Sequence, residues 1–365
     1  MIDILFAFAT AVLPAEGTLA IRARAVWTGA AVLENAVVVV ADGRIRSVGA
    51  EAPRGVEVLE HPGVLTAGLI ALHGPAGAVG ETSDGTRPAL PEARVGLAVD
   101  PRSVELVALH AAGITSILVT PDPAGITAGT SALVRTADGS ILRDPAHLSL
   151  VFSAEGLAGN RAPTSRSGAL AMLDELFAGT RGHVADAKAG RLPCLFEVRE
   201  RDDVQRAVAF ARQRKLAGAL HGAALSGELA SAIRGSGLAV ISPVLGVGTP
   251  RRVLDAVAQL AKEEVPFGFG LDAPWNHQDS LRLSAVLCLR AGLDRAAAWR
   301  ALTANAARIA GAGDRVGRIE RGLDADLVLW SGDPLDLASR AEVVFTRGVA
   351  RTIQHAVPAP EEVRR

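Results

Sequence analysis

Ionisable residues stand where apolar segments of this chain end, and imidazole and carboxylate groups there could bind a metal ion or transfer protons. The stretch "GLIALHGPAG" places His73 directly after an apolar run. A second histidine two residues later would share one face of a strand with it, because side chains alternate with period two. Position 75 is proline, which cannot bind a metal, so half of an H-x-H pair is present. The other candidates are Glu155 in "VFSAEG", Glu197 and Arg199 in "CLFEVRERDD", His221 in "GALHG" and Asp272 in "FGFGLDAP".

Alternating strands and helices must position these residues. Apolar strands are predicted at 114–120, 148–154, 192–198, 216–222, 238–244 and 265–272, with amphipathic helices between them. Residues 131–137 could be an eighth strand or an inserted hairpin. Repeated strand-helix units over about 250 residues predict an α/β fold with a (β/α)8 TIM-like barrel. A doubly wound open sheet stays an alternative, although no G-x-G-x-x-G motif supports it.

Both ends of the chain show β patterns. Residues 18–49 alternate and contain Asp42-Gly43, a strong hairpin signal. The segments "VGRIERGLDADLVLWSGDPL" and "AEVVFTRGVART" bring short strands back after residue 313. We therefore predict a composite β-sandwich domain from residues 1–63 and 314–365, around a barrel of residues 64–313.

Composition narrows the class of partner. The 365 residues carry a formal net charge of −1 and no basic run, which argues against nucleic acid or an anionic membrane. Cys194 and Cys288 both lie in apolar stretches without a CxxC motif, so we interpret them as buried thiols. Residues 1–17 are signal-like but lack a basic start, which leaves cytoplasm and periplasm open, and no later apolar run reaches the ~20 residues of a transmembrane helix.

Three motifs resemble one family. "PGVLTAGLIALHG" resembles the amidohydrolase-superfamily segment P-G-L-I-D-x-H-x-H, and "LTANAARIAG" is similar to its T-x-N-P-A segment. "VGRIERGLDADLVLWSGDPL" resembles the closing signature of that family and is the most specific of the three. The resemblance runs over residues 18–350 and is strongest to imidazolonepropionase-like metal-dependent hydrolases. It implies a metal-bearing barrel, a β-sandwich built from both chain ends, and hydrolysis of non-peptide C–N bonds.

The resemblance also implies roles, and these roles show a degenerate metal site. It implies that Asp272 is the catalytic base and that the metal ligands are His73, Glu155, Glu197 and His221. Ala71 and Pro75 stand where the family has Asp and the second His, and Glu197 and Arg199 replace an H-A-H pair. The alternative is a purely structural role, in which His73 packs in the barrel and forms hydrogen bonds without binding a metal.

Arg199 weighs against a full metal centre. It lies two residues after Glu197, so both side chains should point to one face of a strand. A guanidinium is a permanent cation that repels a divalent ion and pairs with carboxylates. We therefore expect Arg199 in the cavity, in a salt bridge with Glu155, Glu197 or Asp272. At most one divalent ion should bind, zinc or a harder ion, or none at all.

Three functions follow from this. The first is an amidohydrolase-family protein, ancestrally a metal-dependent hydrolase, with eroded ligands and weak or lost catalysis. The alternatives are an active mononuclear hydrolase of cyclic amides or related molecules, and a non-catalytic homologue that binds a small molecule or a protein. A small-molecule ligand or substrate is the expected partner, and homo-oligomerisation stays open.

Overall fold

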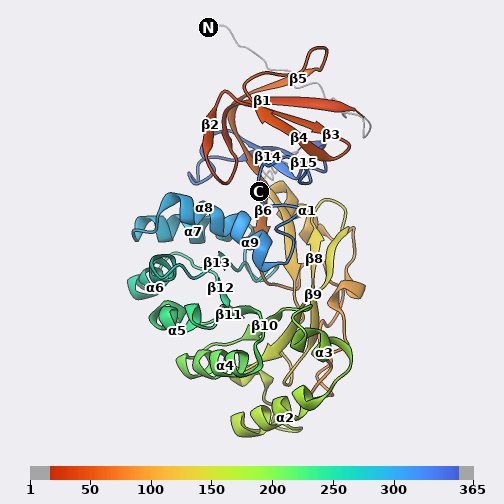
Figure 1. The fold of residues 1–365 in the computed structure, drawn as a ribbon, viewed down its shortest axis with the longest axis vertical. Coiled ribbons are helices and arrows are strands. Elements are labelled where there is room, and N and C mark those ends of the chain that lie inside the picture. Colours follow the sequence, from red (N-terminus) through yellow and green to blue (C-terminus); the bar gives the residue numbers. More distant parts are fainter. Residues whose placement is uncertain (1–16, 353–365) are drawn as a thin grey trace, which may run out of the picture.

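The computed structural model describes residues 17–352, and their strands form two eight-stranded sheets (Figure 1). Most of the predicted signal-like segment lies outside the described residues. The first sheet, here called the end sheet, contains β1 (Thr18–Trp27), β2 (Val32–Glu34), β3 (Val37–Ala41), β4 (Arg44–Gly49), β5 (Val58–Ala67), β14 (Leu327–Trp330), β15 (Ala341–Thr346) and β16 (Val349–Thr352).

The end sheet joins both ends of the described chain. Its order is β16-β15-β14-β5-β1-β3-β4, with β2 on β1, and Figure 1 shows red N-terminal strands beside blue C-terminal strands. β14 pairs antiparallel with β5, with Trp330 opposite Val64. Ile21, Leu65 and Leu327 are fully buried in its core. Strand pairing gives one continuous sheet where a two-sheet sandwich was expected, and the domain boundaries at 63 and 314 stay predictions.

The second sheet is the barrel. It runs in the order β13-β12-β11-β10-β9-β8-β7-β6. Its edge strands meet, because Leu72 N donates to Phe269 O over 3.3 Å and Leu271 N donates to Leu72 O over 2.9 Å. The open doubly wound alternative is therefore wrong. The strands are β6 (Leu69–Ala71), β7 (Ile114–Val119), β8 (Gly129–Arg135), β9 (Ile141–Val151), β10 (Cys194–Glu197), β11 (Gly218–His221), β12 (Ala239–Ser242) and β13 (Phe267–Phe269).

One strand departs from the predicted (β/α)8 pattern. β8 runs antiparallel to both β7 and β9, and no α-helix separates these three strands. The turn after β8 is tight: Arg135 N donates to Ser140 O over 2.8 Å, and Gly139 has a φ of +67°. Both alternatives for residues 131–137 are therefore present, because β8 is the eighth barrel strand and also forms a hairpin with β9. A short apolar run predicts a strand but not its direction.

Helices cover the barrel from outside, and α4, α5 and α6 follow one another along β10 to β13 (Figure 1). None of the helices in residues 17–352 is long and apolar enough to span a membrane. The α-helices are α1 (Val104–Ala111), α2 (Arg166–Ala178), α3 (Gly182–Lys188), α4 (Arg201–Arg214), α5 (Ala230–Arg234), α6 (Arg251–Lys262), α7 (Ser280–Arg290), α8 (Arg295–Leu302) and α9 (Ala304–Ile309). Short 3-10 helices are η1 (Val95–Ala98), η2 (Ala154–Gly156) and η3 (Ser226–Leu229).

Apolar side chains fill the barrel rather than leaving a pore. Ile70, Leu118, Leu195 and Ile241 come from four strands and form one buried cluster. Ala306 of α9 belongs to the same cluster. A filled interior leaves the strand ends and their loops as the place for chemistry.

His147 on β9 is a buried histidine outside the candidate cluster, and it should make the protein sensitive to acid. Burial lowers the pKa of His147 to about 4, even though a hydrogen bond with Ile309 opposes the shift. The unfolded chain takes up this proton near pH 6.5 and the folded chain does not, so stability present above pH 6.5 is lost as the pH falls to 4.

We expect this one group to lower the free energy of unfolding by about 3 kcal/mol between pH 6.5 and pH 4. Urea unfolding across that range is the measurement. The variant His147→Gln should show a correspondingly shallower pH dependence than the parent. Equal slopes in the two proteins would contradict the assignment of a neutral buried imidazole.

Candidate functional site

Four of the predicted site residues stand at the carboxyl ends of barrel strands. Glu197 ends β10 and His221 ends β11, and the two are direct partners in the parallel register. His73 follows β6, and Asp272 follows β13. The barrel seam brings these last two together, since Asp272 N donates to His73 O over 3.0 Å.

Glu197 is the centre of the cluster. Its side chain is fully buried, and its two oxygens contact different imidazoles. Oε1 lies 3.1 Å from His73 Nε2, and Oε2 lies 2.8 Å from His221 Nδ1. His73 Nδ1 lies 2.6 Å from Asp272 Oδ1, and the two imidazoles stack with 3.5 Å between ring centroids. The site is therefore a connected chain of carboxylates and imidazoles.

These contacts shift the acid-base equilibria. Burial alone would lower the pKa of His73, but Glu197 and Asp272 raise it to about 9. Burial alone would raise the pKa of Glu197, but the charges and hydrogen bonds of His221 and His73 hold it well below its usual range. His73 is therefore the buried cation of the cluster. Arg199 is thus not the only positive group beside these carboxylates, and the sequence did not indicate the charge of His73 because its two partners lie on distant strands.

The backbone is unusual at the two residues that meet across the seam. His73 has a φ of +68° and Asp272 a φ of +48°, both in the left-handed region. Residues other than glycine rarely adopt this conformation, and such strain concentrates at functional sites. The conformation aims both side chains at each other above the filled core.

Arg199 and Glu155 form the outer part of the cluster. Arg199 Nε donates to Glu155 Oε1 over 3.1 Å, and Arg199 Nη1 lies 3.7 Å from Glu197 Oε2. The predicted salt bridge of Arg199 is confirmed. The side chains of Arg199 and Glu155 are 35% and 41% exposed, so the pair lies at the mouth rather than among the buried groups. The structure thus connects all six predicted residues through direct contacts.

Sequence reasoning missed three residues that hold this outer pair. Asp203 Oδ2 accepts from the backbone N of Arg199 and of Glu200 over 3.2 and 3.1 Å. Ser153 Oγ donates to Glu155 Oε2 over 3.0 Å. Gly222 leaves the space for the guanidinium, because a Cβ there would lie 1.7 Å from Arg199 Nη1. Glu200 and Asp203 make a capping box at the start of α4, which is a signal that "ERDD" carries.

The amidohydrolase-family model matches residues 176–357, the half of the chain that contains β10 to β16. The chain belongs to the amidohydrolase superfamily. No curated protein sequence matches it.

Solved structures of other proteins agree with the barrel. An amidohydrolase from Thermotoga maritima MSB8 aligns with a TM-score of 0.82 at 21% identity, covering 91% of this chain and 99% of that one. A Xaa-Pro dipeptidase with bound methionine aligns at 0.61 and 12% identity, covering 92% and 100%. Ochratoxinase from A. niger aligns at 0.58 and 16% identity, covering 91% and 94%. At these identities the likeness concerns the fold.

The metal that such a fold implies can be tested against the donor atoms of this amidohydrolase. His221 Nε2 is buried and has no hydrogen-bond partner among the described residues. It lies 3.4 Å from Asp272 Oδ1, and its other nitrogen is fixed by Glu197, the arrangement that orients metal-binding imidazoles. Ligand atoms of His73, His221 and Asp272 all lie within 4.8 Å of one another. The donor set fits one ion, with Asp272 in place of Glu155.

The remaining residues of the cluster do not offer a second ion a comparable set of free donor atoms. Glu155 is bound by Arg199 and Ser153, and Glu197 is bound by both imidazoles. Arg199 brings a permanent positive charge to the space beside them. The geometry does not fit a binuclear centre.

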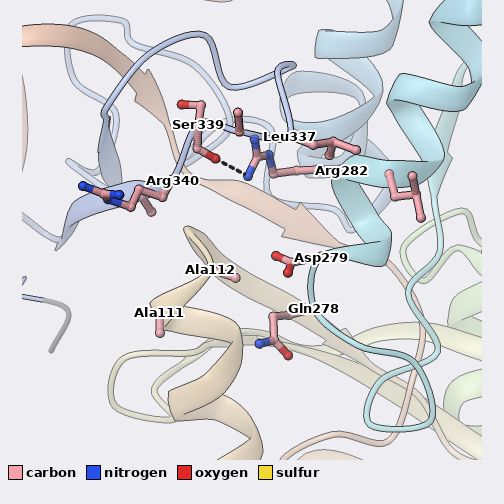
Figure 2. Close-up of a pocket in the computed structure, with 11 residues that line it drawn as sticks. Ala111, Ala112, Gln278, Asp279, Arg282, Leu337, Ser339 and Arg340 are labelled. Atoms are coloured by element: carbon pink, nitrogen blue, oxygen red, sulfur yellow. Dashed lines mark hydrogen bonds between the residues drawn. The ribbon is translucent and has the colours of Figure 1, made fainter. Parts of the chain in front are cut away.

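A hollow lies elsewhere on the molecule, and its lining includes none of the six residues. It measures about 490 Å³ and lies between the end of α1, the start of α7 and residues 337–341 (Figure 2). Figure 2 shows Arg282 reaching toward Ser339, and its guanidinium donates to the backbone oxygens of Pro334, Asp336 and Ser339 over 2.8, 2.5 and 2.9 Å. Arg282 thereby fixes the segment between β14 and β15 on the barrel.

Proposed function

We propose that this amidohydrolase hydrolyses C–N bonds of small molecules such as cyclic amides, with at most one divalent ion and with weak catalysis. The single observation that supports this most is the buried Nε2 of His221. A buried nitrogen without a partner is costly, and a cation bound between this nitrogen and Asp272 Oδ1, which lie 3.4 Å apart, would satisfy both groups.

The charges of the cluster support one ion. Three carboxylates belong to Glu155, Glu197 and Asp272, and two cations belong to Arg199 and His73. A bound divalent ion would take the place of the His73 proton, because a ligand imidazole must be neutral, so one ion leaves no net charge and two would leave two positive charges in a largely buried site. Two imidazoles and one carboxylate are also a donor set that zinc accepts.

The residues would divide the reaction as follows. His221, Asp272 and a His73 that has given up its proton would hold the ion, which when bound lowers the pKa of water to about 7. Asp272 is the acceptor for the water proton, because its side chain is 30% exposed while Glu197 is fully buried. Burial would raise the pKa of Asp272, but the imidazoles of His221 and His73 hold it far below its usual range.

A second candidate function is non-catalytic binding. The observation in its favour is that both nitrogens of His73 face carboxylates, so that its imidazolium can neutralise them without an ion. In that case the mouth binds a small molecule, and hydrolysis is lost. Metal content separates the two candidates.

Elemental analysis of the purified protein should find close to one equivalent of a divalent ion and not two. The variant His221→Ala should lose that ion, and chelator-sensitive hydrolysis of cyclic amides should fall by at least about 100-fold. His183→Ala is the matched control, since His183 contacts Pro91 and Glu92 away from the cluster. An ion-free parent without hydrolysis would favour the binding function, and two equivalents of ion would overturn both.

A further inference from the structure

We propose that the outer edge of the Arg199 guanidinium binds a carboxylate of the substrate. The preferred substrates would then be C–N compounds that carry a carboxylate near the bond to be cleaved. This inference rests on the proposed function for the identity of the reacting atoms, but the binding that it describes can be measured without hydrolysis.

The guanidinium of Arg199 is fixed from several directions. Its Nε donates to Glu155, and its Nη1 donates to the backbone oxygen of Val198 over 3.2 Å. The backbone N of Arg199 donates to the buried Asp203. Gly222, with a φ of +97°, leaves the volume that Nη1 occupies. A side chain held in this way loses little rotamer freedom when a ligand binds.

One nitrogen of this fixed group is left over. Arg199 Nη2 has no hydrogen bond to any residue in the range 17–352, although Nε and Nη1 both do. The side chain is 35% exposed, so a molecule that enters the mouth can reach Nη2. Its two N–H groups are donors without acceptors, and carboxylates are the acceptors that guanidinium groups recognise best.

An ordinary surface ion pair lacks the additional contacts that fix the Arg199 guanidinium. Arg252 and Glu228 form such a pair over 2.7 Å on the outside of the barrel, where both are partly exposed. Arg199 differs, because its Nη1 also lies 3.7 Å from Glu197, which contacts both imidazoles of the cluster. A substrate carboxylate bound to Nη2 would therefore lie beside the cluster that contains Asp272 and the two imidazoles, where the C–N bond is proposed to be cleaved.

A matched pair of cyclic amides tests this inference. 5-Hydantoinacetic acid and its carboxamide differ in one charged group, and their dissociation constants can be measured by calorimetry with the purified protein. We expect the acid to bind the parent at least about tenfold more tightly than the amide, as a charge-assisted hydrogen bond predicts. Arg199→Gln should remove this preference, and Arg252→Gln, the control, should retain it.

The outcomes are distinct from those of the proposed function. A preference that survives in Arg199→Gln, or a parent that shows none, would overturn the role of Arg199, whatever hydrolysis is found. A preference that depends on Arg199 in a protein without hydrolysis would support carboxylate binding and count against the hydrolase. Metal content in Arg199→Gln that is no lower than in the parent would show that the lost preference is not a loss of the ion.

Discussion

Replacing Arg135 by methionine should lower the free energy of unfolding by about 3–5 kcal/mol, the cost of breaking a buried ion pair on one side. Arg135 on β8 is 3% exposed and joins the barrel to the segment before β14. Its Nε lies 3.0 Å from Asp326 Oδ2, and its Nη2 lies 2.5 Å from Asp324 Oδ2. Burial raises the pKa of Asp326, and Arg135 opposes that shift, so methionine leaves an uncompensated buried carboxylate.

Urea unfolding of Arg135→Met against the parent is the measurement. Arg22→Met is the control, because the Arg22–Glu60 pair is exposed and should be worth under about 1 kcal/mol. The double variant with Asp326→Leu should recover part of the loss, since it removes the unpaired charge. A cost for Arg135→Met no greater than that for Arg22→Met would show that the network between barrel and end sheet contributes little.

The strands that carry the site could be predicted, and the reason is local. Each is a continuous apolar run, because both faces of a barrel strand are buried, and each predicted run overlaps an observed strand from β7 to β13. The direction of β8 could not be predicted, because an apolar run reads the same for a parallel and an antiparallel strand. The motif that contains Asp324 and Asp326 was recognisable, but its partner Arg135 lies almost 190 residues away in the chain.

The site shows the same division between local and distant information. Period-two spacing placed Glu197 and Arg199 on one side, and the two do lie within 3.7 Å. The charge state of His73 depends on Glu197 and Asp272, which the fold brings from β10 and from the end of β13. No local pattern contains that information, and so the sequence did not predict the positive charge of His73.

Replacing Arg199 by histidine should raise the metal content from at most one equivalent to two, and this result tests why the site holds so few ions. Arg199 supplies the positive charge beside Glu155 and Glu197. Histidine removes the permanent cation and adds an imidazole nitrogen beside Glu197 and beside Glu155, which has lost its ion-pair partner. Elemental analysis after dialysis against zinc and against manganese is the measurement.

Arg199→Gln separates the two effects of that change. Glutamine also removes the charge but offers no good ligand for zinc, so it should bind less of the second ion than Arg199→His does. Equal gains in both variants would mean that the charge of Arg199 alone excludes the ion. No gain in either variant would mean that Arg199 does not stand in the place of an ion. Its contacts with Glu155 and Glu197 would then serve packing or ligand binding alone, and the missing histidine at position 75 would become the stronger reason for a site limited to one ion.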